Sequence, residues 1–168
     1  MIFEFSMLPM VISLTVAALC LTFSLFQALV ALKRPEFPWN KWGAGLSLLT
    51  AIYAVAVFFQ YNLAEEPANI LCERVQYTIF PLLVHALFGF TAAFLSFSGR
   101  RRHQFLLIWH AVLLGVLWSS PLIVGDTFVT RHFLWLDTPY IEPATGRWGI
   151  IYLLSALGVA LYVLTVWL

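Results

Sequence analysis

The chain has 168 residues, of which 62% are hydrophobic and 10% are charged, and its net charge is +1. An average soluble domain has roughly 25% charged residues, and a soluble fold of this length could not hide so much apolar surface. The composition therefore excludes an ordinary soluble domain and predicts an integral membrane protein. The near-neutral charge gives no reason to expect nucleic acid as a partner.

Five runs without any acidic or basic residue divide the sequence: 7–32, 42–61, 75–97, 105–124 and 148–168. With about 20 residues or more, each can cross roughly 30 Å of hydrocarbon as a helix. Helices satisfy their own backbone hydrogen bonds in lipid. We therefore predict an all-α integral membrane protein, a five-helix transmembrane bundle that forms one domain over residues 1–168. The last run has no basic flank, so we expect the chain to be a fragment of a longer bundle.

Basic residues concentrate in two loops between these runs. The loops after the first and third runs hold six basic residues and one acidic residue: Lys33, Arg34, Lys41, Arg100, Arg101, Arg102 and Glu36. The N-terminal tail and the two remaining loops hold three basic and seven acidic residues. Because short basic loops stay in the cytoplasm, we predict that the N-terminus lies on the outer, non-cytoplasmic side of the membrane.

Polar side chains gather in the predicted outer third of the spans, near Pro81 and Pro121. They are Gln60, Gln76, Tyr77, Ser119, Ser120 and Tyr152, with His85 deeper. Two interpretations stay open. These groups make ordinary hydrogen bonds between helices, or they line a small pocket that opens outward and binds a small or lipophilic ligand.

The third run also carries a stripe with a four-residue period, from Tyr77 through Pro81 and His85 to Gly89 and Ala93. Such residues share one face of a helix. Pro81 lacks an N–H and so leaves the carbonyl of Tyr77 without its helical donor. Gly89 and Ala93 form a pair of small residues that predicts close packing of another helix.

His85 and His110 are the histidines inside the runs. Counted from the inner ends of their runs, they lie about 18 Å and about 7–8 Å deep at 1.5 Å per residue. Paired haem ligands must face each other at one level, so we expect neutral interhelical hydrogen bonds instead of haem. We predict no cofactor and no metal site. The runs contain no charged group of the kind that pumps and transporters use, and no catalytic motif suggests an enzyme.

The fourth loop, residues 125–147, is too apolar for a free solvated coil. Residues 130–136 are typical of a strand, and Asp137-Thr138-Pro139 is typical of a turn. We predict a short hairpin over the outer mouth of the bundle.

Three stretches of sequence also carry a family resemblance. They are Lys33-Arg34-Pro35, then Glu73-Arg74-Val75-Gln76-Tyr77 followed by Pro81, and finally Ser120-Pro121 with Thr145-Gly146-Arg147-Trp148 and Tyr152. In this order they resemble the seven-helix N-terminal sensor region of bacterial membrane histidine kinases, a region that also precedes PAS domains and diguanylate cyclases.

The resemblance implies two more helices after Leu168 and a cytoplasmic output domain, both absent here. It also implies a multi-pass location in the bacterial inner membrane and a homodimer formed through the parent protein. The expected function is then that of a sensor module in signal transduction, without catalytic activity of its own. The alternative is a small structural or accessory subunit of a larger membrane complex.

Overall fold

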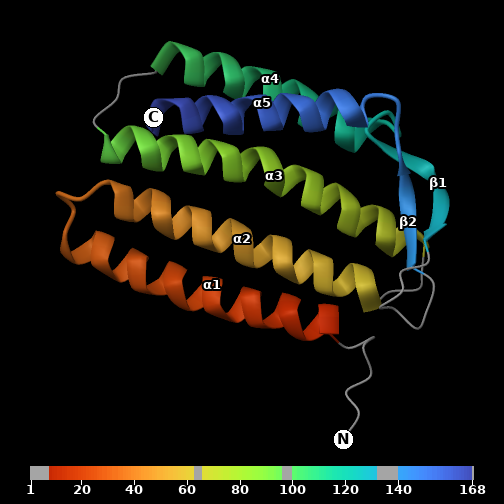
Figure 1. The fold of residues 1–168 in the computed structure, drawn as a ribbon, viewed down its shortest axis with the longest axis horizontal. Helices are drawn as coiled ribbons and strands as arrows, with labels where there is room; N and C mark the ends of the chain where they lie inside the picture. Colours follow the sequence, from red (N-terminus) through yellow and green to blue (C-terminus); the bar gives the residue numbers. More distant parts are fainter. Residues whose placement is uncertain (1–7, 63–65, 96–99, 132–139, 168) are drawn as a thin grey trace, which may run out of the picture.

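The computed structural model describes residues 8–62, 66–95, 100–131 and 140–167. Its elements follow the order α1 (Leu8–Lys33), α2 (Trp39–Asn62), α3 (Glu66–Phe94), α4 (Arg100–Ser119), β1 (Val124–Arg131), β2 (Tyr140–Thr145) and α5 (Gly149–Trp167). The helices lie side by side, and the two strands form a hairpin at one end of them (Figure 1). The prediction of a mainly helical protein is confirmed.

Three helices of the described chain are long and apolar enough to cross a membrane. They are α1, α2 and α3, whereas the apolar helical stretches Gln104–Ser119 and Gly149–Val159 are shorter. With 29 residues, α3 is about 43 Å long at 1.5 Å per residue, which exceeds the roughly 30 Å of a hydrocarbon core. Part of α3 would therefore extend beyond the hydrocarbon core of a membrane.

The helix ends differ from the charge-free runs. α3 begins at Glu66 and α4 begins at Arg100, so both helices take in charged residues that the runs left out. At its other end α4 stops at Ser119, whereas the run continued to residue 124. A proline cannot continue a helix, and Pro121 follows this end in a turn. The predicted span 105–124, which included Pro121, is therefore too long, whereas Pro81 does lie inside α3.

The predicted hairpin is present, with earlier boundaries. β1 and β2 pair antiparallel, with Val124 opposite Thr145 and Arg131 opposite Tyr140. Residues 132–136 of the expected strand and its turn at 137–139 lie outside the described residues. A Cβ atom on Gly146 would lie 2.3 Å from the carbonyl oxygen of Leu122, so only glycine fits where the hairpin returns to the helices.

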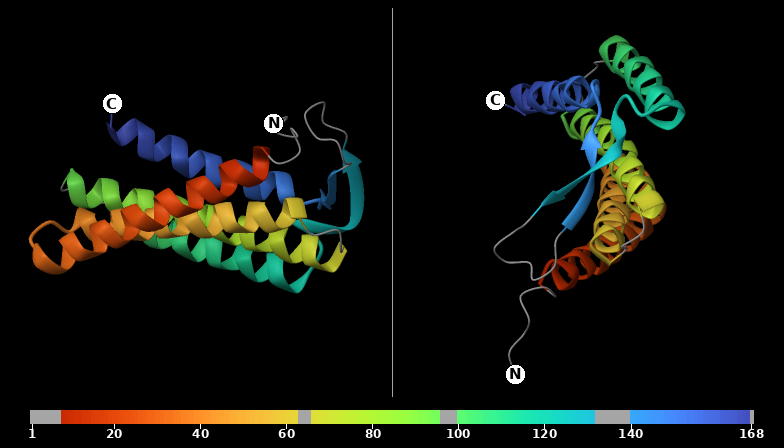
Figure 2. Two further views of the ribbon diagram at one scale, coloured as in Figure 1. Left: turned by 90° about the horizontal axis from the view of Figure 1, so that it is seen from below. Right: turned by 90° about the vertical axis from the view of Figure 1, so that its right-hand side faces the viewer.

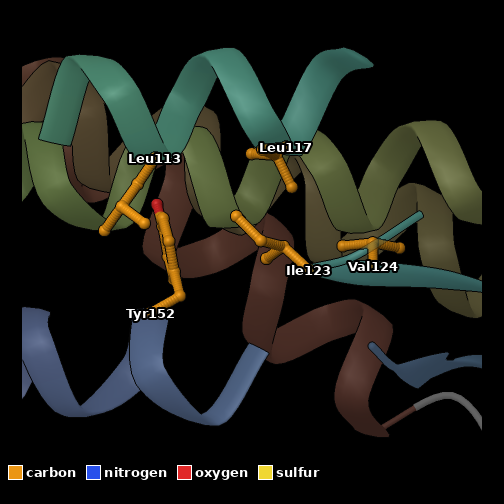
Figure 3. Packing of buried hydrophobic residues seen from close by; sticks show 5 residues of the cluster. All are labelled: Leu113, Leu117, Ile123, Val124 and Tyr152. Carbon is orange, nitrogen blue, oxygen red and sulfur yellow. The ribbon is translucent and has the colours of Figure 1, made fainter. Parts of the chain in front are cut away.

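A small apolar core joins the hairpin to the helices. It consists of Leu113 and Leu117 from α4, Ile123 and Val124 at the start of the hairpin, and Tyr152 from α5 (Figure 3). Ile70 and Tyr77 of α3 pack against it. This core fixes the start of α5 beside α3.

The opposite end of the bundle is the basic end. Lys33, Arg34, Lys41 and the three arginines that begin α4 all belong to helix ends or connections on that side (Figures 1 and 2). The hairpin end instead mixes both signs, with the acidic residues Glu66, Glu73, Asp126 and Glu142 and the basic residues Arg74, Arg131 and Arg147. The charge difference between loops in the sequence is therefore a difference between the two ends of the molecule.

Candidate functional site: a polar cavity at the hairpin end

A cavity of about 230 Å³ lies between three helices near the hairpin. Its lining consists of Tyr53 from α2, then Glu73, Gln76, Tyr77 and Phe80 from α3, and Tyr152 and Leu153 from α5. The α3 residues follow the spacing i, i+3, i+4 and i+7, which places them on one face of a helix. Three of the seven predicted ligand-binding candidates, Gln76, Tyr77 and Tyr152, therefore meet in one cavity.

A chain of side-chain hydrogen bonds forms the polar wall of the cavity. Gln76 Nε2 donates to Gln60 Oε1, and Gln60 Nε2 donates to Glu73 Oε2 over 2.6 Å. Gln60 and Gln76 are buried, with exposed fractions of 5% and 9%. Gln60 is thus connected to the cavity through Glu73 and Gln76, although it does not itself belong to the lining. The chain of bonds fixes the position of the Glu73 carboxylate.

Another part of the cavity wall depends on Pro81, which lies inside α3. Since Pro81 has no N–H, the carbonyl of Tyr77 lacks its helical donor, and the hydroxyl of Tyr152 donates to that carbonyl. The side chain of Tyr152 is fully buried, with an exposed fraction of 0%. The rings of Tyr77 and Tyr152 lie 5.3 Å apart at an angle of 37°. A tyrosine of α5 therefore supplies the hydrogen bond that the proline removes.

The histidines lie elsewhere, and they meet each other. His110 Nδ1 and His85 Nε2 are 2.9 Å apart and share a hydrogen bond. The depth argument that separated them was wrong because it used the ends of the charge-free runs. Measured from Phe94 and Arg100, the true helix ends, both histidines lie about 14–15 Å along their helices. The expectation of hydrogen bonding between helices is confirmed. The bond joins the two imidazole nitrogens directly to each other over 2.9 Å.

His85 borders a second, apolar cavity of about 560 Å³ between α2 and α3, together with Trp42, Gly45 and Leu49. It does not line the polar cavity. Nearby, a Cβ atom on Gly89 would lie 2.4 Å from the indole ring of Trp42. The group that packs closely against Gly89 is therefore an aromatic side chain of α2. Ala93, the second member of the small-residue pair, is half-buried near the end of α3.

The two serines form hydrogen bonds with their own helix. Ser119 Oγ donates to the carbonyl of Gly115, and Ser120 Oγ donates to the carbonyl of Val116, over 2.7 and 2.8 Å. Neither serine belongs to the lining of the polar cavity. They occupy carbonyl oxygens at the end of α4, before Pro121.

Sequence reasoning missed four residues of the cavity: Tyr53, Glu73, Phe80 and Leu153. Glu73 was placed in a loop because it precedes the third charge-free run. The signal that could have found it is its spacing, since Glu73 lies three residues before Gln76 and four before Tyr77. Among the seven lining residues, one is acidic, four are aromatic and none is basic.

The described part of the chain contains no group of three or more His, Cys, Asp or Glu residues that could hold a metal ion. Cys20 and Cys72 are free thiols. Comparisons with protein families, curated protein sequences and solved structures found no match to this chain.

Proposed function

We propose that this chain is the membrane-embedded sensor module of a signal-transduction protein and that the polar cavity binds its ligand. The observation that carries the proposal is the convergence of α2, α3 and α5 on a polar cavity beside the hairpin. Sites between the helices of a bundle are a common place for ligands. Withdrawing the Glu73 carboxylate from water costs free energy, which the hydrogen bond from Gln60 and a bound ligand would offset.

The surface of the helices supports a membrane location. Leu19, Leu25 and Phe26 of α1 are largely exposed, as are many apolar residues of the other helices. Contiguous apolar surface on this scale is unusual for a soluble monomer and suits contact with lipid. By the distribution of basic residues, the hairpin end faces outward and the other end faces the cytoplasm. A solute outside the cell would then reach the cavity from the hairpin side.

The route from the cavity to the cytoplasmic end is α3 itself. Glu73, Gln76 and Tyr77 lie before Pro81, and the contacts of His85 with His110 and of Gly89 with Trp42 lie after it. A proline inside a helix removes one backbone hydrogen bond and makes bending easier. Ligand binding would bias α3 between two packings, and its far half would carry that difference to the output domain.

The resemblance to the sensor regions of membrane histidine kinases agrees with this proposal. On that basis we propose a bacterial inner-membrane location, a homodimer formed through the parent protein, and a histidine kinase or diguanylate cyclase as the output.

A second candidate, a small accessory subunit of a membrane complex, is favoured by a different feature. An apolar groove of about 550 Å³ lies between α4 and α5, lined by Phe105, Leu106, Leu154, Gly158 and Tyr162 among others. Such a groove could receive a helix of another subunit.

A genetic complementation experiment separates the two candidates. Cells that lack the native gene are complemented with the wild-type gene, with Gln76→Leu, or with the exposed control Leu71→Val on the same helix. The sensor function predicts that only Gln76→Leu changes the transcriptional response, at equal protein level. The subunit function predicts equal transcript profiles for both variants and, in the deletion strain, loss of another membrane complex on native gels.

A further inference from the structure

The lining of the polar cavity indicates the chemical class of the ligand, an inference that rests on the proposed function. Glu73 contributes the one acidic side chain of the lining, and four of the other six residues are aromatic. The volume, about 230 Å³, is below the roughly 300–1,000 Å³ of sites for drug-sized molecules. The cavity therefore suits a small ligand.

Among the described side chains, no basic group is paired with Glu73. Within the described residues, no ion pair joins Glu73 to a Lys, Arg or His. The ion pair found there is between Arg34 and Glu36. Arg74 is the next residue, but adjacent positions on a helix do not face each other. Gln60 occupies one carboxylate oxygen. Glu142 of β2 lies near enough to interact electrostatically with Glu73 and adds further negative potential. A half-buried carboxylate in this setting favours a cation.

The aromatic residues favour one kind of cation over others. Tyr53, Tyr77, Phe80 and Tyr152 line the same small space, where the Tyr77 and Tyr152 rings pack against each other with their centroids 5.3 Å apart. Aromatic rings attract cations through their quadrupoles, and aromatic cages recognise quaternary ammonium groups. A metal ion would need several oxygen ligands, whereas the lining offers one carboxylate and one amide besides three tyrosines.

We propose that the polar cavity binds a small organic cation of the quaternary ammonium type, with its charge beside Glu73 and its methyl groups among the aromatic side chains. The same trimethylammonium group occurs in a free solute, such as choline, and in the headgroup of a phosphatidylcholine lipid.

The test uses the whole chain in nanodiscs of phosphatidylglycerol and a matched pair of probes. Choline carries the charge, and 3,3-dimethylbutan-1-ol has the same shape without it. Titration calorimetry is expected to show that choline binds at least about tenfold more tightly than its neutral isostere. Glu73→Gln should remove this preference, whereas the control Glu66→Gln, at an exposed acid of the same helix, should keep it. Equal affinity for the two probes, or a choline affinity unchanged by Glu73→Gln, would overturn the proposal.

A second pair of variants keeps the test decisive if Glu73→Gln does not fold. Tyr53→Phe retains the ring and should bind choline like the wild type, and Tyr53→Leu should weaken binding by about threefold or more. Equal binding by the two variants would contradict an aromatic cage. Nanodiscs that contain phosphatidylcholine distinguish the two sources, since competition with choline indicates a lipid headgroup and unchanged affinity indicates a free solute.

Failure of the cation proposal and failure of the sensor function give different results. If the neutral isostere binds as well as choline and Gln76→Leu still alters the transcriptional response, the cavity is a sensor site for another class of ligand. If choline binds with the expected preference and Gln76→Leu leaves the response unchanged, the cation site stands and the sensor function does not.

Discussion

The two halves of α3 differ in what they contact. Before Pro81 the helix presents Glu73, Gln76 and Tyr77 to a polar cavity. After Pro81 it is packed tightly, with Gly89 against the ring of Trp42 and His85 bonded to His110. Substitutions in the far half should therefore change stability, and substitutions in the half beside the hairpin should change binding with smaller effects on stability.

The largest effect on stability is expected at Gly89. Gly89→Leu places a side chain where the indole of Trp42 lies, and overpacking of this kind costs about 1–3 kcal/mol. Thermal unfolding in detergent measures the loss. Gly115→Leu is the matched control, because a Cβ atom on Gly115 meets nothing within 4 Å. Combining Gly89→Leu with Trp42→Ala should recover part of the loss, and equal melting temperatures for the two glycine variants would contradict the contact.

A loss of stability in the same range is expected at Tyr152. Tyr152→Phe removes the hydroxyl that donates to the carbonyl of Tyr77, and a buried carbonyl left without a donor costs about 1–3 kcal/mol. Pro81→Ala restores an N–H that can serve the same carbonyl. Tyr152→Phe should therefore cost less in the Pro81→Ala background. A cost that is the same in both backgrounds would show that the hydroxyl does not replace the missing helical bond.

The hydrogen bond between His85 and His110 should contribute less to the free energy of unfolding than the Tyr152 hydroxyl does. A double-mutant cycle with His85→Ala and His110→Ala is expected to give a coupling energy of about 0.6 kcal/mol, and no more than about 1.7 kcal/mol, the average and the maximum found for hydrogen bonds between membrane helices. The measurement is the free energy of unfolding of the four proteins. Additive losses, with no coupling, would mean that the two rings do not hold α3 and α4 together.

The smallest effect on stability is expected at Gln76, in the part of the cavity lining that α3 contributes. Gln76→Leu removes one amide from a chain that ends at the half-buried Glu73, so we expect a loss of about 1 kcal/mol or less together with weaker choline binding. Leu71→Val, at an exposed position of the same helix, should change neither quantity. A Gln76→Leu protein that loses as much stability as Gly89→Leu would remove the distinction between the two halves.

Some of this architecture follows from the sequence, and the reasons are physical. The helical class follows from charge-free runs of membrane length, and the need of the Tyr77 carbonyl for a donor follows from Pro81 four residues later. The positions of the helix ends could not be predicted from the sequence in this way. A run without charges indicates a segment suited to lipid, but α3 and α4 continue beyond such runs into turns that carry charged residues. That error separated His85 from His110 and left Glu73 in a loop. The contact of the Trp42 ring with Gly89 could not be predicted either, because a small residue does not specify which side chain fills the space beside it.

The central claim is that binding in the polar cavity changes the packing of the far half of α3. Spin labels at Lys41 and Phe94, exposed positions near the basic ends of α2 and α3, report that packing in a protein with Cys20 and Cys72 replaced by alanine. We expect saturating choline to shift the distance between the labels by about 1–2 Å, the scale of helix shifts in switching proteins. The Glu73→Gln protein should show no shift. Identical distances with and without bound choline in the protein that retains Glu73 would contradict the account.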